Sequence, residues 1–281
     1  MEKPFIKLAN ASGFLFQIGI DHEITRVRAS KGGNWEVIAR EHRWFDPASN
    51  SEAFIDLILQ SHAGRMIVEC KRTTDATWLF LVPNSATEVK RAKLLWTCQA
   101  EGNPPVTAWD DLNLHPPSLE SSFCIVRGRG EGDAPMLERL AGSLLRATEA
   151  VAEQELSIGP QQAYGPARIY LPVVITNADL RVCRFSPEDI DLKTGRINKT
   201  ETQAVDFLKF RKSLSTTHQI STGINDLQQA NIEDERTVIV MNVTALESIL
   251  PHMKLQKPSI VSPSGPVWPW EIAIRRFGES P

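Results

Sequence analysis

The 281-residue sequence predicts an α/β protein with a mixed central sheet flanked by helices. Helix-like and strand-like segments alternate along the chain, and short polar reversals between apolar runs indicate hairpins, so part of the sheet is antiparallel. A hydrophobic content of 42% and a charged content of 23% are ordinary for a globular chain. The formal net charge of -3 gives no general basic surface, so contact with nucleic acid would require a local patch.

The first helix is expected over residues 12–28, where Ser12 is a candidate cap. Its apolar residues recur at helical spacing and are Phe16, Ile20, Ile24 and Val27. Residues 35–44 then predict a strand. The stretch 54–72 contains two apolar runs around the polar reversal 60–64, in which Gly64 is free to take a positive φ, and it predicts a hairpin.

The middle of the chain mixes strand, helix and loop signals. The apolar run 78–82 predicts a strand, and residues 86–98 are interpreted as a short helix with a basic face. Four prolines within 102–118 argue against regular structure there. Residues 121–127 are a further strand candidate. The clearest helix is predicted over 133–158, because its apolar residues form a continuous stripe.

The last third predicts a second hairpin and a buried strand. Residues 169–176 and 180–185 flank a short polar turn, and Pro172 favours an edge or a bulge in the first of these strands. The apolar run 237–243 predicts a buried strand, and 245–253 a short helix.

The chemically informative residues lie in the 54–72 hairpin. Alternate residues of a strand face opposite sides, so Ile67, Glu69 and Lys71 are expected to share one face. Folding the hairpin brings Asp56 near Glu69 and Lys71. Burying such charges is costly unless they pair or bind metal, and two carboxylates suit Mg²⁺ or Mn²⁺. The alternative is a solvated charge pair on an exposed strand, which is common for an isolated Glu-x-Lys.

Asp56, followed after twelve residues by Glu69-Cys70-Lys71, resembles the signature of the PD-(D/E)XK superfamily of restriction-endonuclease-like nucleases. Ile55 stands where the signature has proline. The resemblance implies a restriction-endonuclease-like core over residues 1–185, interrupted by an insertion near 73–130. Residues 186–281 are then expected to form a C-terminal extension packed on that core.

The resemblance also implies roles for the charged residues. Asp56 and Glu69 would hold Mg²⁺ or Mn²⁺, and Lys71 would orient the attacking water or neutralise the transition state. Glu23 is the candidate for an additional metal ligand, because the first core helix of the superfamily often supplies one; the alternative is a solvated charge on that helix. Glu41 shares a strand face with Trp35 and ranks below Glu23, because its neighbours His42 and Arg43 indicate a solvated strand end.

The implied function is hydrolysis of phosphodiester bonds in DNA. The alternative is a non-catalytic module of the same fold that binds nucleic acid or a protein. A homodimer or a partner protein fits either reading. The sequence predicts a cytoplasmic protein without a membrane span. Its cysteines are scattered, it shows no signal-peptide pattern, and it has no apolar run of membrane-spanning length.

A basic cluster, Lys209, Arg211 and Lys212, is interleaved with Phe207 and Phe210. Either these basic residues contact nucleic acid, or the aromatic residues belong to the core and the charges are solvated.

Overall fold

The computed structural model describes residues 4–62, 64–74, 76–98, 105–127, 136–158, 167–197, 200–214, 227–255, 260–262 and 265–267. Its helices are α1 (Pro4–Ala11), α2 (Phe14–Lys31), α3 (Met136–Ile158), α4 (Leu227–Glu233) and α5 (Leu246–Ile249). Among the described residues, no helix combines the length and apolar character needed to cross a membrane.

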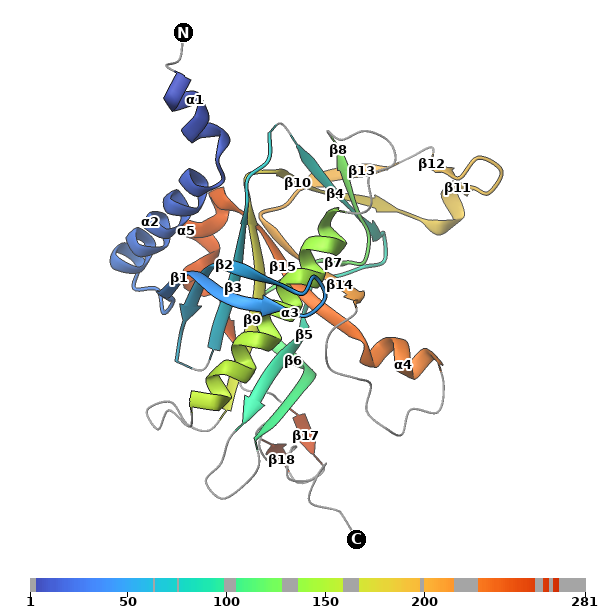
Figure 1. Cartoon of the computed structure of the whole chain (residues 1–281). Helices are drawn as coiled ribbons and strands as arrows, with labels where there is room; N and C mark the ends of the chain where they lie inside the picture. The colour runs from blue at the N-terminus through green and yellow to red at the C-terminus, as the bar shows by residue number, and fades with distance from the viewer. Residues whose placement is uncertain are drawn as a thin grey trace.

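The main sheet is mixed and runs through the centre of the molecule (Figure 1). Its strands, in spatial order, are β1 (Glu36–Asp46), β2 (Ser51–Gln60), β3 (Gly64–Lys71), β9 (Ala167–Thr176), β15 (Glu235–Asn242), β14 (Phe207–Ser213) and β7 (Glu120–Ser121). Also attached are β5 (Val89–Cys98), which pairs with β9, then β6 (Val106–Ser118) and β16 (Lys254–Leu255).

A smaller sheet lies beside the main one. Its order is β13 (Glu201–Ala204), β10 (Asp179–Phe185), β4 (Thr77–Pro83) and β8 (Cys124–Arg127). Two short ribbons complete the described strands: β11 (Ile190–Asp191) with β12 (Arg196–Ile197), and β17 (Ile260–Ser262) with β18 (Gly265–Val267).

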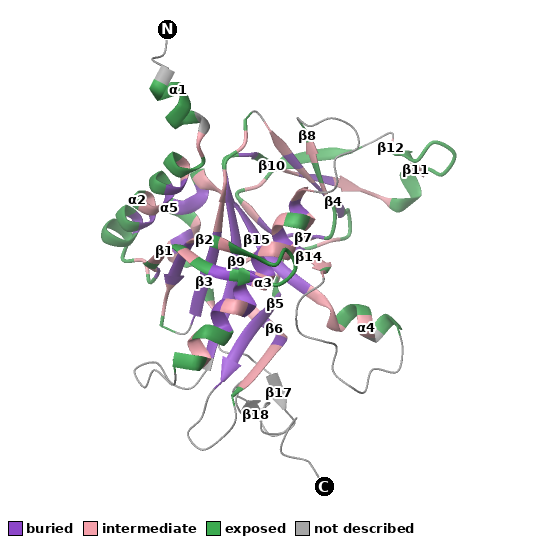
Figure 2. Cartoon of the chain, viewed as in Figure 1, coloured by how far each residue is buried: buried purple, intermediate pink, exposed green. Residues whose placement is uncertain are grey.

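Helices cover both faces of the main sheet, which confirms the predicted α/β class. On one face Ile67 packs in a core cluster with Leu145 and other residues of α3. On the other face Val68 belongs to a cluster that includes Ile24 of α2 and Leu246 of α5. Figure 2 shows the sheet strands buried between these layers. Because both sides of β3 are covered, its first five residues are all buried.

The chain order around β3 determines where the site residues lie. After α2, the strands β1, β2 and β3 pair antiparallel with one another. Strand β9 then pairs with β3 in parallel, from Gly64↔Ile169 to Lys71↔Thr176. A parallel neighbour needs a crossover, and α3 immediately precedes β9 and packs against it. The prediction that helix 133–158 covers the sheet is confirmed from Met136 onward; residues 133–135 lie outside the described residues.

The expectation of a short helix over 86–98 is wrong, because Val89–Cys98 forms strand β5. Seven consecutive residues of β5, from Ala92 to Cys98, are buried between neighbouring layers. A strand buried on both faces has no polar alternation, so its sequence does not show the period of two. Lys93, interpreted as part of a basic helix face, is instead buried and pairs with Glu233 at 3.4 Å.

The prediction that residues 102–118 lack regular structure is also wrong, because Val106–Ser118 forms strand β6. The pairing of β6 with β5 runs to Asn113 and resumes at Ser118, and the shift in register leaves the residues between them out of the ladder. Pro116 and Pro117 fall in this gap, where the missing N–H of proline costs no hydrogen bond with β5.

The predicted hairpin 169–185 is wrong for a topological reason. Both edges of β9 are occupied, by β3 on one side and by β5 and β15 on the other, so β10 joins the small sheet. Pro172 lies on this central strand, between the residues that pair with β5 and those that pair with β15. The region after residue 185, expected as an extension packed on the core, contributes β14 and β15 to the main sheet itself.

Candidate functional site

Asp56 lies where strands β2 and β3 separate. The two strands pair from Gln60↔Arg65 to Leu57↔Val68, and the next positions along them are Asp56 and Glu69. There the Asp56 side chain takes the place of a backbone partner, because its Oδ2 accepts a hydrogen bond of 2.6 Å from the Cys70 N–H. The Asp56 carbonyl accepts a bond of 3.0 Å from Gln17 Nε2 of α2. These contacts hold the carboxylate at the end of the hairpin.

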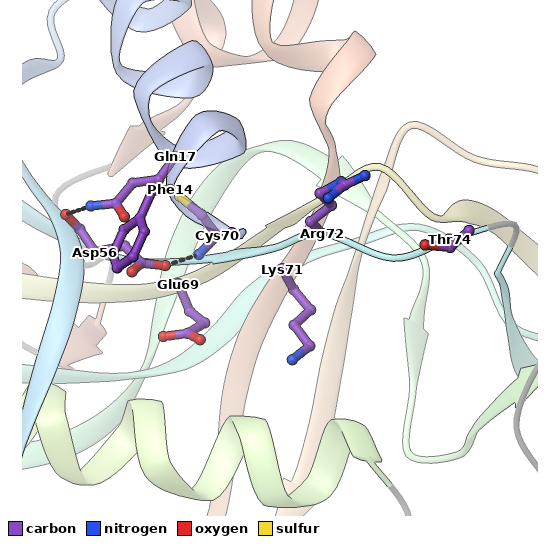
Figure 3. Close-up of a pocket in the computed structure, with 9 residues that line it drawn as sticks. Phe14, Gln17, Asp56, Glu69, Cys70, Lys71, Arg72 and Thr74 are labelled. Atoms are coloured by element: carbon purple, nitrogen blue, oxygen red, sulfur yellow. Dashed lines mark hydrogen bonds between the residues drawn. The ribbon is translucent and has the colours of Figure 1, made fainter. Parts of the chain in front are cut away.

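Glu69 and Lys71 extend from the same side of β3, towards α3, as predicted (Figure 3). Cys70 points to the opposite side, where it packs against the cluster that contains Val68. Strand β9 pairs with β3 as far as Lys71. The backbone of the Glu-x-Lys segment is therefore fixed by β9 on the edge of β3 that faces away from β2. Among the described residues, neither the Glu69 carboxylate nor the Lys71 ammonium has a hydrogen bond or an ion pair within 4 Å.

An open pocket of about 390 Å³ surrounds these side chains. It is lined by Gly13, Phe14, Gln17, Asp56, Glu69, Cys70, Lys71, Arg72 and Thr74. The volume is in the range of small-molecule sites, and the lining brings two carboxylates, a lysine and an arginine together. We therefore take this pocket as the candidate site.

The first turn of α2 forms one wall of the pocket. Ser12 was the expected cap, but the N-cap is Gly13, which forms no side-chain cap bond, while Ser12 Oγ donates to the Ala9 carbonyl. An uncapped helix start leaves N–H groups and the positive end of the helix dipole facing the pocket, and both favour an anion. Phe14 and Gln17 were not predicted as site residues, because only the packing of α2 against the hairpin brings them there. Arg72 directly follows Lys71 in the chain and also lines the pocket, although its place in the sequence did not single it out.

The two carboxyl groups are electrostatically strained. Burial, then the negative charge of Asp56, raises the pKa of Glu69 to about 7, against an opposing effect of Lys71. Burial also raises the pKa of Asp56, although the Cys70 N–H opposes this, and Glu41 adds a further repulsive charge. Carboxylates that remain close and under-compensated are typical of functional sites, including sites that receive a cation.

Glu41 approaches the carboxylate pair, whereas Glu23 does not. In the register of β1 and β2, Glu41 stands between Arg40↔Leu57 and His42↔Ile55, which places it opposite Asp56. Its backbone is left-handed, with φ of 48°, which is uncommon for glutamate within a strand. Glu23, the predicted additional ligand, pairs with Arg26 at 2.6 Å and does not line the pocket.

The donor set fits a hard divalent cation in part. Asp56 and Glu69 supply carboxylate oxygens, the ligands that Mg²⁺ prefers. In the part of the chain that the structure describes, no group of three or more histidine, cysteine, aspartate or glutamate side chains is arranged to hold a metal ion. Mg²⁺ commonly uses only one or two protein carboxylates and completes its coordination shell with water and substrate phosphate. Asp56 and Glu69 therefore match the number of carboxylates that such a site commonly has.

The basic residues around Phe210 are engaged within the fold. The Lys209 ammonium is fully buried and donates to the Val89 carbonyl, and Arg211 pairs with Asp111 at 2.7 Å. Lys212 pairs with Glu138 at 2.9 Å. These contacts support the interpretation of Phe210 and its neighbours as core. They also engage the three cations with groups of the protein itself.

Comparison of the chain with protein-family models, with curated proteins and with solved structures finds no match. The site must therefore be interpreted from its own geometry and charge.

The raised pKa of Glu69 predicts a pH-dependent difference in stability between the wild-type protein and Glu69→Gln. A carboxyl group with a raised folded-state pKa stabilises the fold fully below its unfolded pKa of about 4.5, and this contribution is lost as the pH rises through about 7. Relative to Glu69→Gln, the wild-type free energy of unfolding should fall by roughly 3 kcal/mol across this window. Urea titrations at a series of pH values, with EDTA present, measure the difference.

Glu52→Gln is the matched control for this titration. Glu52 is exposed and pairs with exposed Arg43, so Glu52→Gln should differ from the wild type by less than about 1 kcal/mol at every pH tested. A wild-type minus Glu69→Gln difference that is equally flat would contradict the electrostatic description of the site.

Proposed function

We propose that this chain is a metal-dependent nuclease that hydrolyses phosphodiester bonds in DNA. The observation that carries the proposal is the pair of under-compensated carboxylates, Asp56 and Glu69, beside Lys71 in an open pocket. A surface charge pair would be solvated or bonded to a neighbour, whereas Glu69 is substantially buried and its carboxylate has no hydrogen-bond partner within the described residues.

The arrangement of elements supports a restriction-endonuclease-like core. Helix α2 is followed by three antiparallel strands, and β9 is parallel to the strand that carries Glu69 and Lys71. The three residues that carry the resemblance, Asp56, Glu69 and Lys71, line one pocket. Strands β4 to β8 stand between β3 and α3 in the chain; of these, β5, β6 and β7 join the main sheet and β4 and β8 the smaller one.

In this proposal Asp56 and Glu69 hold Mg²⁺ or Mn²⁺, which when bound polarises a phosphoryl oxygen and lowers the pKa of a water molecule. The remaining groups act on the phosphate. Lys71 lies on the same side of β3 as Glu69 and supplies positive charge where negative charge develops on the phosphorane oxygens. Arg72 and the positive end of the dipole of α2, whose first turn lines the pocket, attract the flanking backbone phosphate.

A cleavage assay tests the proposal directly. Purified protein is incubated with supercoiled plasmid, and in parallel with labelled single-stranded DNA and RNA, in Mg²⁺, in Mn²⁺ and in EDTA. We expect cleavage of DNA that needs the divalent cation and is lost in Asp56→Asn, because the amide keeps the bond from the Cys70 N–H but removes the charge. Titration calorimetry with Mn²⁺ should show binding that the same variant abolishes.

Two results would redirect the proposal. Mn²⁺ binding without cleavage on any substrate would favour an enzyme that needs an activating partner. Neither cation binding nor cleavage would overturn the nuclease proposal and leave the non-catalytic module of the same fold as the better interpretation.

A further inference from the structure

The start of the chain exposes a cluster of large apolar side chains. We call this cluster the N-terminal apolar face; its members are Phe5, Ile6, Leu8, Phe14, Leu15 and Ile18, with exposed fractions from 48% to 84%. Scattered single apolar residues are normal on protein surfaces, whereas six within fifteen positions of α1 and the first part of α2 form a patch. Figure 2 shows α1 and this end of α2 exposed.

The rest of the described chain does not cover this face. Helix α1 projects beyond α2, away from the main sheet (Figure 1). Arg72 donates a hydrogen bond to the Asn10 carbonyl of α1, and this contact with the body does not involve the apolar side chains. A short helix held at one end gains little from forming alone, so α1 is expected to be stabilised by something that packs on its apolar side.

The face is also poor in charge. Lys7 is the one charged residue between Pro4 and Ile20 in the sequence. Depletion of charge is characteristic of the core of homodimer interfaces, which are more apolar than transient ones. A helix that lies on a membrane surface instead carries several lysines and arginines on its polar side, which α1 does not have.

We propose that the N-terminal apolar face is a dimerisation surface that packs against the same face of a second copy of this chain. An isologous contact requires only self-complementarity, which an apolar helix surface provides without matching charges. A fully buried aromatic side chain hides about 150–250 Å². Two phenylalanines and four aliphatic side chains, each about half or more exposed, therefore offer an area of the same order as the roughly 800 Å² that each partner contributes to a standard stable interface. The inference does not depend on the nuclease proposal.

The dimer surface continues into the candidate site. Phe14 belongs to the face and also lines the pocket, and Gly13 beside it caps α2. The second copy therefore packs against the helix turn that forms the pocket wall.

Light scattering after size-exclusion chromatography, and sedimentation velocity over a series of protein concentrations, test the proposal on the full chain. The wild-type protein should have the mass of two chains. In the double variant Phe5→Gln/Leu8→Gln the dissociation constant should rise by about a hundredfold or more, since each change removes an anchor side chain from the contact. Glutamine retains helix propensity, and both residues lie outside the pocket, so the fold should be preserved by circular dichroism.

A matched double variant, Leu192→Gln/Leu227→Gln, removes two even more exposed leucines from other parts of the surface and should remain dimeric. A wild-type protein with the mass of one chain at every concentration would overturn the proposal. Such a monomer could be tested further with vesicles of phosphatidylcholine and phosphatidylserine, where co-sedimentation would assign the face to a membrane surface. A double variant that stays dimeric would show that another surface forms the contact.

Discussion

Replacing Lys71 with alanine should lower the rate of DNA cleavage by about 10²–10³-fold, the usual effect of removing one group that stabilises transition-state charge. Below about pH 6, where Glu69 with its pKa of about 7 is mostly protonated, the free energy of unfolding should change by less than about 0.5 kcal/mol, as for substitutions that break no buried contact. Lys71 has no hydrogen bond or ion pair within the described residues, so its removal leaves no partner unsatisfied. Single-turnover cleavage of labelled DNA in Mg²⁺, with urea titrations of both proteins, separates rate from stability.

The same substitution should move the pH profile of any remaining cleavage towards higher pH. Lys71 opposes the rise in the pKa of Glu69, so without its charge the carboxyl ionises at a higher pH. Lys90→Ala is the matched control, because it removes an exposed lysine from β5, outside the pocket. Cleavage by Lys71→Ala at the wild-type rate would refute the assigned role of the lysine, whatever the metal requirement.

Replacing Glu155 with alanine should destabilise the protein by roughly 3–5 kcal/mol, the typical result of removing one partner from a buried ion pair. Glu155, on α3, accepts from Arg65 Nε at 2.6 Å and pairs with Arg168 Nη1 at 2.8 Å. The buried Tyr170 hydroxyl also donates to it, at 2.9 Å. Burial would raise the pKa of Glu155, yet the two guanidinium groups, Arg65 foremost, hold it below its ordinary value. The variant would leave two buried cations without their counter-charge.

Urea denaturation measures this effect as a lower midpoint with an unchanged slope. Because domains are stable by only about 5–15 kcal/mol, a loss of this size would be a large part of the total. Glu52→Ala is the control, since both partners of its ion pair with Arg43 are mostly exposed and the expected loss is below about 1 kcal/mol. A similarly small loss for Glu155→Ala would mean that water reaches Arg65 and Arg168 when the carboxylate is removed.

The hairpin that carries the candidate site could be predicted because its signal is local. Alternation along a strand depends only on backbone geometry, so the shared face of Ile67, Glu69 and Lys71 follows from their spacing. Helix α3 was predicted for the same reason, from an apolar stripe that repeats every turn. In both cases one side of the element faces the core and the other side faces a more polar region. This difference between the two sides appears in the sequence as a regular spacing of apolar and polar residues.

Strand β5 was misassigned because it lacks that difference. It is buried on both faces, because its Leu94 and Trp96 belong to one core cluster and its Leu95 to the other, so the alternation typical of a strand is absent from its sequence. Gly64 was predicted for a positive φ, but it is not among the described glycines with a positive φ. A Cβ there would come within 2.4 Å of Leu255, so the close packing of β16 accounts for the glycine.

The sequence by itself determined the α/β class, the hairpin and the approach of Asp56 to Glu69 and Lys71, because each depends on residues that are near in the chain. Only the tertiary structure decided which other groups join them. Helix α2 packs so that its first turn, with Phe14, forms the pocket wall, while Glu23 lies away from the pocket beside Arg26. Glu41 faces the pair because of the register between β1 and β2. Register and helix packing are set by the burial of whole faces against distant segments, which no local spacing encodes.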